Sequence, residues 1–278
     1  MGALELLDSW PVPTAAAAVV GPSRGGVCVL ATHGDTAARF RLASVTKPLV
    51  ARAAHVAVEE GAFELDTPAG PPGSTVRHLL AHASGVSMQG PDHLAAPGTR
   101  RIYSNYGFTL LAEALQGTTE IEFGSYLHEA VFEPLGMAST ALTGGAAAAG
   151  YGGESCVDDL ARFAADLLRP VLVTSDLHAE ATTVQFPGLD GVLPGFGSQR
   201  PNDWGLGFEL RAHKSPHWTG SANSPATFGH FGQSGTFLWV DPVADLALVV
   251  LTDRDFGDWT HAVWPTISDG VLREFGAH

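Results

Sequence analysis

Ser44 and Lys47 stand three residues apart in the segment Ser44-Val45-Thr46-Lys47-Pro48. Positions i and i+3 share one face of a helix, so a helix here would bring the serine hydroxyl beside the lysine amine. An unaided hydroxyl is a poor nucleophile and needs a neighbouring base, and a lysine amine can serve once burial disfavours its charged form. The pair therefore predicts nucleophilic catalysis, although a serine N-cap followed by a solvated lysine fits the same residues.

The helix that would hold this pair is marked by its own sequence. Proline is tolerated only in the first turn, so Pro48 sets the helix start at or just before Ser44. Apolar residues recur at three- and four-residue steps through 45–60, and Gly61 fits a C-terminal cap. The free N–H groups at the helix start would then face the negative charge that develops when Ser44 attacks a carbonyl group.

Tyr103 and Asn105 form a second candidate pair, two residues apart and just before a predicted helix over 107–115. In an extended or turning loop, residues i and i+2 point the same way, so a phenol and an amide would face one pocket. The phenol can relay a proton, while the amide can bind a substrate carbonyl or the lysine. A core tyrosine followed by an asparagine cap is the alternative.

A third candidate is the glycine-rich segment that contains His230, Gly232 and Gln233. Glycines at 229, 232 and 235 leave the backbone bare, as it must be where a substrate lies along a strand edge. The N–H of Gln233, after Gly232, could then be a second donor to the oxyanion. An ordinary strand bend with a packed histidine is the alternative.

The rest of the chain predicts an α/β fold in which a helical block interrupts a sheet. Strands are expected at 15–20, 26–32, 204–210, 235–240 and 246–252, with a closing helix at 259–275. Helices are expected at 75–83, 107–115, 121–131 and 157–168, and a mobile linker at 144–153. We therefore expect a discontinuous sheet domain, 1–65 and 194–278, a helical subdomain, 66–193, and an active site between them.

Composition excludes several classes of function. The 278 residues include 15 Lys and Arg against 29 Asp and Glu, a net charge of −14, which argues against binding to nucleic acid or to anionic membranes. No apolar run approaches the roughly 20 residues that span a bilayer, and no signal segment is seen, so a cytoplasmic protein is expected. The two cysteines, Cys28 and Cys156, make no disulfide framework and are expected to be small buried residues.

The three candidate segments, in this order, resemble the serine β-lactamases and penicillin-binding proteins. The resemblance is strongest to the class C-like branch with its esterases and D-aminopeptidases, and it covers about residues 15–275. Ser44–Lys47 is similar to the Ser-x-x-Lys motif, Tyr103–Asn105 to Tyr-x-Asn, and His230–Gly232 to [Lys/His]-x-Gly. Three flanking stretches also look familiar: 79–85, 133–137 and 204–208.

The resemblance implies an antiparallel sheet with terminal helices, a helical subdomain, and catalysis through an acyl-enzyme on Ser44. Lys47 and Tyr103 would share the acid and base work, Asn105 would hold Lys47 and the substrate amide, and the N–H groups of Ser44 and Gln233 would form the oxyanion hole. No metal or organic cofactor is implied. The substrate would be a small molecule or short peptide, and the oligomeric state is unknown.

Two departures from the family pattern concern the third motif. His230 stands where β-lactamases proper usually have a lysine, and Phe231 replaces a residue that often carries a hydroxyl, so efficient β-lactam hydrolysis is disfavoured. Trp218-Thr219-Gly220 is a second candidate for this motif, but His230 is preferred because strand residues follow it directly.

We therefore expect a serine hydrolase that cleaves an ester or amide bond. A biosynthetic acyltransferase with the same acyl-enzyme is an alternative, and so is a non-catalytic binding protein on this fold. His78 and His82 would share a helix face, but no third ligand accompanies them, so a structural role is favoured over a metal site.

Overall fold

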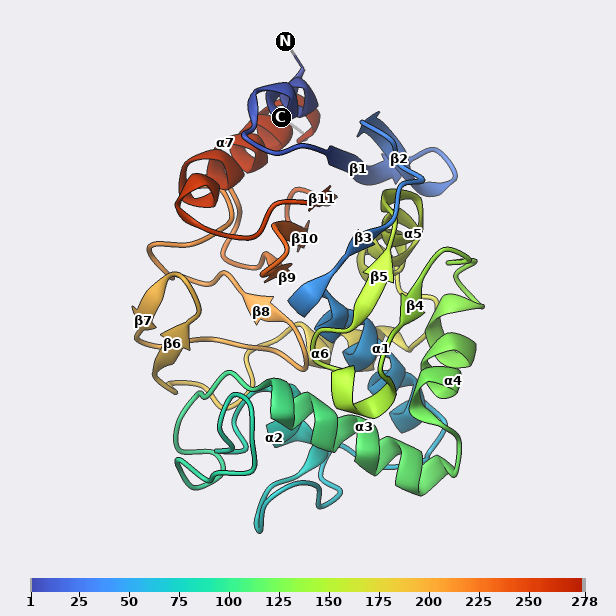
Figure 1. Ribbon diagram of the computed structural model, residues 1–278, viewed down its shortest axis with the longest axis vertical. Helices are drawn as coiled ribbons and strands as arrows, with labels where there is room; N and C mark the ends of the chain where they lie inside the picture. The colour runs from blue at the N-terminus through green and yellow to red at the C-terminus, as the bar shows by residue number, and fades with distance from the viewer. Residues whose placement is uncertain (1, 277–278) are drawn as a thin grey trace.

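The computed structural model describes residues 2–276 and is built around one six-stranded antiparallel sheet (Figure 1). The strand order is β2-β1-β11-β10-β9-β8, so a strand near the start of the chain pairs with one near its end. The strands of this sheet are β1 (Ala15–Ser23), β2 (Gly26–His33), β8 (Glu209–Leu210), β9 (Phe228–Gly232), β10 (Thr236–Asp241) and β11 (Leu246–Thr252). Smaller sheets contain β3 (Phe40–Arg41), β5 (Gly153–Ser155) and β4 (Ala141–Leu142), and β6 (Gly191–Leu193) with β7 (Gly197–Gln199).

Both faces of the main sheet are covered, and for this reason its central strands are apolar throughout. Successive side chains of a strand point to opposite faces. On β1, Ala17 and Val19 join Trp239 and Trp264 in one buried cluster, whereas Ala18 and Val20 belong to the cluster on the other face. The sheet is thus the middle layer between two hydrophobic cores.

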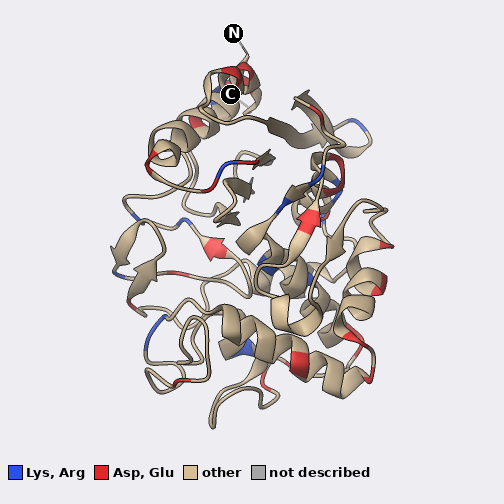
Figure 2. Cartoon of the chain, viewed as in Figure 1, with Lys and Arg blue, Asp and Glu red and all other residues tan. Residues whose placement is uncertain are grey.

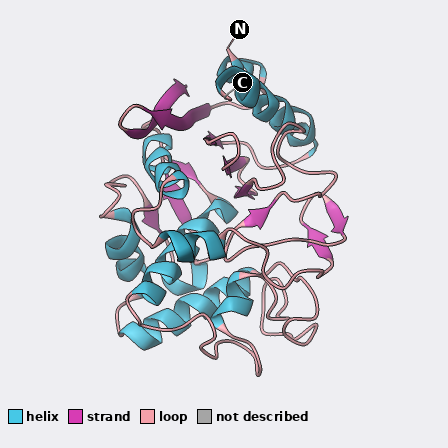
Figure 3. Cartoon of the chain, turned by 180° about the vertical axis from the view of Figure 1, so that it is seen from behind, coloured by secondary structure: helices cyan, strands magenta, loops and turns pink. Residues whose placement is uncertain are grey.

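The helices divide between these two faces. The 3-10 helix η1 (Ala3–Ser9) and α7 (Asp258–Phe275) pack together at one end of the molecule, and α5 (Val157–Leu168) packs on β1 and β11 (Figures 1 and 3). The remaining helices are η2 (Ala43–Val45), α1 (Thr46–Glu59), α2 (Val76–Leu80), α3 (Asn105–Thr119), α4 (Phe123–Leu127), η3 (His128–Phe132), η4 (Gly145–Ala148) and α6 (Ser175–Ala181). The predicted α/β architecture with an antiparallel sheet and helices is confirmed. The predicted bounds of the two domains stay a prediction.

Several local predictions were wrong. The segment 144–153 is not a free linker but holds η4 and the start of β5, and it packs against α3. The strand expected over 204–210 is limited to β8, because Gly207 adopts a left-handed φ of 87° and its N–H donates to the carbonyl of Leu80. Cys28 is exposed on β2, whereas Cys156 is buried as expected.

The acidic residues are distributed over many elements, including η1, η3 and β8, rather than gathered in one patch (Figure 2). Such dispersed charge keeps a protein in solution without defining a binding surface. Within residues 2–276, no helix combines the length and the apolar character needed to cross a membrane.

A buried ion pair joins α1 to α5 behind the sheet. The guanidinium of Arg52 lies 3.0 Å from a carboxylate oxygen of Asp166, and both side chains are fully buried. The other carboxylate oxygen of Asp166 accepts the N–H groups of Val171 and Leu172, at 2.9 and 3.1 Å. Asp166 therefore fixes the loop after α5 and neutralises a cation in the core.

We predict that Asp166→Asn lowers the free energy of unfolding by about 3–5 kcal/mol, because it leaves the Arg52 charge buried without a partner. Urea denaturation at neutral pH measures this change. Asp245→Asn is the matched control, since Asp245 pairs with the exposed Arg169 at the surface and its loss should cost about 0–1 kcal/mol. Equal effects of the two substitutions would contradict the prediction.

Candidate active site

A cavity of about 230 Å³ lies where η2, the loop before α3 and the end of β9 meet. It is mostly apolar, with a few polar groups converging on one side, as is typical of small-molecule sites. It is lined by Ala43, Ser44, Met88, Gln89, Tyr103, Asn105, Tyr151, Leu193, Pro194, Trp204, Glu209, His230, Phe231 and Gln233. Five of the seven residues predicted from sequence are among them, and the other two, Lys47 and Gly232, lie just behind this wall.

Ser44 lies in the 3-10 turn η2, two residues before α1 begins at Thr46. The α-helix therefore starts slightly later than the sequence predicts. Ala43 has a φ of 46°, a left-handed conformation that an alanine adopts only under constraint. The hydroxyl of Thr46 supplies part of that constraint, since it donates to the carbonyl of Ala43 at 2.6 Å and accepts the N–H of Gly153 at 2.8 Å.

Lys47 extends from the first turn of α1 into the core, where its side chain is completely buried. Its amine donates to the side-chain oxygen of Asn105 at 2.6 Å and to the carbonyl of Gly150 at 2.8 Å. The hydroxyl oxygen of Ser44 is 3.4 Å away. The amine thus has two carbonyl oxygens and one hydroxyl around it, and it forms no ion pair with any residue in 2–276.

Burial lowers the pKa of the Lys47 amine well below the usual value for lysine. A neutral amine has two N–H donors and one lone pair. The two short contacts, to Asn105 and Gly150, use the two donors, which leaves the lone pair for the proton of Ser44. The geometry and the electrostatics therefore both suit Lys47 to be a base.

Tyr103 completes the array on the opposite side of Ser44. Its hydroxyl donates to the Ser44 oxygen at 2.7 Å, and its ring centroid is 4.5 Å from the Lys47 nitrogen. Burial raises the pKa of the Tyr103 phenol, so this hydroxyl is protonated at neutral pH. In this state the phenol holds a proton that it can donate toward Ser44.

The loop that presents Tyr103 and Asn105 is held at its centre by Ser104 and His82. Ser104 is the N-cap of α3 and accepts the N–H of Gly107 at 2.8 Å, so Asn105 is the first helical residue and not the cap. The ring of His82 accepts the N–H of Ser104 at 3.2 Å and lies 4.7 Å from the ring of Tyr103. His82 is buried, and it supports the loop that holds Tyr103 and Asn105.

The third predicted motif lies on β9 and at its end. His230 lines the cavity with its ring 5.8 Å from that of Tyr103. Burial lowers the pKa of His230 to about 3, so its ring is neutral at physiological pH, and its Nδ1 is 2.6 Å from the Phe231 carbonyl. A neutral histidine cannot offer a substrate carboxylate the charge that a lysine would.

Gly232 lets β9 approach the turn that carries Ser44. A Cβ atom at this position would lie 2.2 Å from the carbonyl oxygen of Leu42 and 3.3 Å from the Cβ of Ala43. No side chain fits there, and this closeness brings the backbone of Gln233 to the same cavity as Ser44. Within residues 2–276, no backbone carbonyl accepts the N–H of either residue, so both remain available to an oxyanion.

The profile of the family described as Beta-lactamase matches residues 11–268. The chain belongs to the beta-lactamase family.

Solved structures agree with this family assignment. A beta-lactamase from Mycobacterium bovis is 71% identical, covers 99% of this chain and 100% of its own, and superposes with a TM-score of 0.97. A penicillin-binding protein homologue from Pyrococcus abyssi, 20% identical, covers 98% of this chain and 75% of its own, with a TM-score of 0.73. A simvastatin synthase mutant from Aspergillus terreus, 16% identical, covers 98% and 96%, with a TM-score of 0.80. The last two show the fold alone.

Curated relatives are more distant. A Salmonella heidelberg protein provisionally named a D-alanyl-D-alanine carboxypeptidase is 24% identical over 57% of this chain and 46% of its own length. The chain therefore matches about half the length of these relatives.

Trp218-Thr219-Gly220 is the other candidate for the third family motif. It lies outside the cavity wall. Trp218 is buried, and its indole N–H donates to the carboxylate of Glu209 at 2.9 Å. Gly220 lies against Asp269 of α7, where a Cβ atom would be 2.1 Å from a carboxylate oxygen. Neither residue lines the cavity, whereas His230 does.

Glu209 is a cavity residue that sequence analysis missed. Its carboxylate is hydrogen bonded to the amine of Lys214, to His217 at 2.9 Å and to Trp218. Burial alone would raise the pKa of this carboxyl, but the charges and hydrogen bonds of Lys214 and His217 lower it to about 2. The Glu209 carboxylate in the wall of the cavity is thus fully paired. Its partners follow it closely in sequence, but their spacing matches no motif, so the pattern gave no signal of this cluster.

Gly150 is a second residue that sequence analysis missed, because its carbonyl, and not a side chain, contacts Lys47. A Cβ atom on Gly150 would be 3.1 Å from the Cα of Asn105, so the glycine permits close packing against α3. The glycines of 144–153 were a signal of such an approach, but they fit a mobile linker equally well. His78 packs on Phe186, and residues 2–276 hold no group of three or more His, Cys, Asp or Glu side chains arranged for a metal ion.

The lowered pKa of Lys47 makes a prediction about stability. Between the folded-state pKa and the usual lysine value, the unfolded chain binds one more proton than the folded chain, so stability rises with pH. At pH values just below the usual lysine pKa, we expect the wild-type free energy of unfolding to rise with pH relative to that of Lys47→Met, by at most about 1.4 kcal/mol per pH unit. Urea denaturation at several pH values gives both slopes, and parallel slopes would mean that Lys47 is charged in the folded protein.

Proposed function

We propose that this protein is a serine hydrolase that cleaves an ester or amide bond through an acyl-enzyme on Ser44. The observation that carries the proposal is the array in which Ser44 lies between a buried amine of lowered pKa and a protonated phenol. Lys47 is 3.4 Å from the Ser44 oxygen and Tyr103 is 2.7 Å from it. A binding protein would gain nothing from keeping a lysine buried without an ion pair, because burial of an amine is costly.

Acylation begins when Lys47 takes the proton of Ser44 and the serine oxygen attacks the substrate carbonyl carbon. The carbonyl oxygen becomes an oxyanion, which the backbone N–H groups of Ser44 and Gln233 would stabilise. The side-chain amide of Asn105 lines the cavity while its oxygen holds Lys47, so its nitrogen can donate to the substrate.

The leaving group departs as the tetrahedral intermediate collapses. Tyr103 is placed to donate its proton to the departing oxygen or nitrogen, and the ammonium of Lys47 then gives the proton that it took from Ser44 to the Tyr103 phenolate. Water attacks the ester on Ser44 by the reverse of these transfers, and the acid is released. The net reaction consumes one water and regenerates all three side chains.

The cavity favours an uncharged acyl group. Apolar side chains such as Met88, Leu193 and Phe231 dominate its wall, His230 is neutral, and the Glu209 carboxylate is already paired. A substrate carboxylate would find no cation beside the third motif, so we expect simple esters and amides to react faster than β-lactams. The same acyl-enzyme could pass its acyl group to an alcohol or amine, which makes acyl transfer the second candidate.

Replacement of Ser44 tests whether it is the nucleophile. Wild-type protein exposed to p-nitrophenyl acetate should gain one acetyl group on Ser44 or turn the ester over, and Ser44→Ala should do neither. Intact-protein mass and nitrophenol release measure the two outcomes, and benzylpenicillin in a parallel sample tests β-lactam recognition. Ser9→Ala is the control, because Ser9 is exposed and distant from the cavity. Acylation that persists in Ser44→Ala would exclude Ser44 as the nucleophile.

Replacement of Tyr103 tests whether it is the acid. Tyr103→Phe keeps the ring that packs on His82 but removes the donor to Ser44, so kcat/KM should fall by about 100-fold or more. The loss should be greater for an alkyl ester than for p-nitrophenyl acetate, because nitrophenolate leaves without needing a proton. An equal loss with both esters would indicate a structural role for Tyr103.

A further inference from the structure

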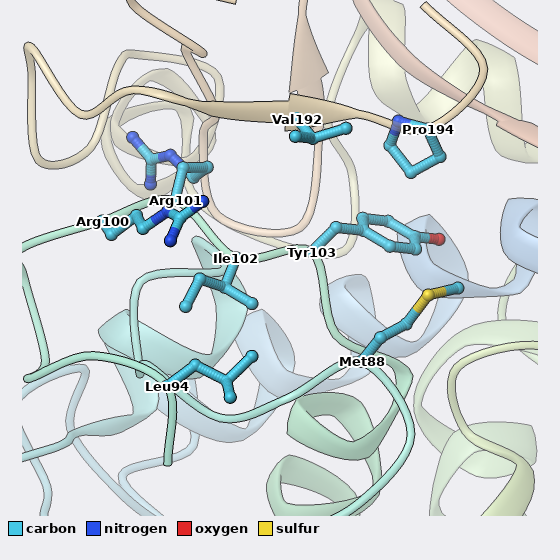
Figure 4. Close-up of a pocket in the computed structure, with 8 residues that line it drawn as sticks. All are labelled: Met88, Leu94, Arg100, Arg101, Ile102, Tyr103, Val192 and Pro194. Atoms are coloured by element: carbon cyan, nitrogen blue, oxygen red, sulfur yellow. The ribbon is translucent and has the colours of Figure 1, made fainter. Parts of the chain in front are cut away.

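A second cavity, of about 200 Å³, lies beside the first and shares Met88, Tyr103 and Pro194 with it. We call this second cavity the trough. Its other lining residues are Leu94, Arg100, Arg101, Ile102 and Val192 (Figure 4). The shared residues make the trough an extension of the proposed catalytic pocket and not a separate site.

The walls of the trough are apolar and open to solvent. Met88 is 45% exposed, Leu94 59% and Val192 53%, and these three are among the eight large apolar residues that are exposed within residues 2–276. Monomeric proteins rarely gather exposed apolar side chains unless the patch binds something. Because the patch leads directly to Ser44 through Tyr103, its natural occupant is part of the substrate.

The two arginines at the far end of the trough differ sharply. Arg101 is buried, and its guanidinium donates to four backbone carbonyls: Ala81, Asn202, Gln185 and Phe186. Arg100 is exposed and makes no hydrogen bond or ion pair with a described residue. Figure 4 shows both arginines at the end opposite Pro194 and the Tyr103 hydroxyl. In a chain of net charge −14, Arg100 is thus a free cation at the end of an apolar path.

Tyr103 determines which part of the substrate the trough can hold. Of the proposed catalytic groups, Tyr103 lines both cavities, whereas Ser44, Asn105 and Gln233 line the first. The group that receives a proton from Tyr103 is the leaving group, so the leaving group must lie next to the phenol. A chain that continues from that atom enters the trough, while the acyl part stays beside Asn105.

We propose that the trough binds the leaving group of the substrate, an alcohol or amine with an apolar body and an anionic end that pairs with Arg100. This assignment rests on the proposed hydrolase function and adds a substrate class to it. A guanidinium pairs well with a carboxylate or a phosphate, and an apolar spacer matches Met88, Ile102 and Val192. No covalent step beyond the proposed hydrolysis is involved.

The test holds the acyl group constant as acetyl and varies the alcohol. The probes are methyl acetate, hexyl acetate, 6-acetoxyhexanoate, 6-acetoxyhexyl phosphate and 6-(trimethylammonio)hexyl acetate, and acid release gives kcat/KM. From methyl to hexyl acetate, kcat/KM should rise by about two- to fourfold per CH₂. Val192→Ser should reduce that rise, whereas Val243→Ser, at an exposed valine in the β10–β11 turn, should not.

The charge of Arg100 is tested with the charged probes. Arg100→Gln should lower kcat/KM for the carboxylate and phosphate probes by about two- to fivefold relative to its effect on hexyl acetate. It should raise kcat/KM slightly for the cationic probe. Arg100→Lys should restore part of the loss, and Arg24→Gln, which removes an exposed cation in the β1–β2 turn, should have no effect. Of the carboxylate and phosphate probes, the one whose kcat/KM falls more in Arg100→Gln carries the anion that Arg100 prefers.

The outcomes separate this inference from the hydrolase proposal. If esters are turned over with a kcat/KM that depends neither on the alcohol nor on the substitutions of Val192 and Arg100, the trough assignment is wrong and the hydrolase proposal stands. If no ester reacts and Ser44 is not acylated by p-nitrophenyl acetate, both proposals are overturned. If Arg24→Gln and Arg100→Gln have equal effects, the anion is attracted by the overall charge and not by Arg100.

Discussion

A buried lysine without a counter-charge is the constraint around which this site is organised. The amine of Lys47 is removed from water between α1, α3 and the turn at Gly150, and it finds two carbonyl oxygens but no carboxylate within residues 2–276. Placing an ammonium there would cost several kcal/mol, so the protein lowers the pKa of the amine instead. The same burial that makes this position unfavourable for a charge makes the lysine a base, and the fold must supply enough stability elsewhere to keep it there.

Close backbone approach is what lets three distant segments meet around that lysine. At Gly232 a side chain would collide with the carbonyl of Leu42, and at Gly150 it would press tightly on Asn105. Thr46 then connects the turn of Ser44 to Gly153 through two hydrogen bonds. Because these contacts are made by glycines and main-chain atoms, the site has little room to relax, which suits a nucleophile that must hold its orientation.

The sequence predicts those parts of this arrangement that depend on local spacing. Ser44 and Lys47 are brought together by one helical turn, and Tyr103 and Asn105 by one loop, so their short separations were sufficient. Gly150 was missed because it contributes only a carbonyl, to a lysine that is distant in sequence. Glu209 was missed because no spacing rule predicts that the loop after it folds back and places Lys214 and His217 on its carboxylate. The strand expected at 204–210 was shortened by the turn at Gly207, which the apolar pattern does not reveal.

The strand order also affects the timing of folding during synthesis. β1, made near the beginning, is flanked by β2 on one side and by β11 on the other, and the register aligns Ala15 with Thr252. The ribosome therefore releases Ser44 and Lys47 long before β9, β10 and β11 exist. Contacts of such high sequence separation fold slowly, and the apolar β1 must wait with one edge unpaired. A chain interrupted before β11 holds Ser44 and Lys47 but lacks the strand that pairs with β1, so the sheet and the cavity beside it can assemble only after translation has passed the last strand.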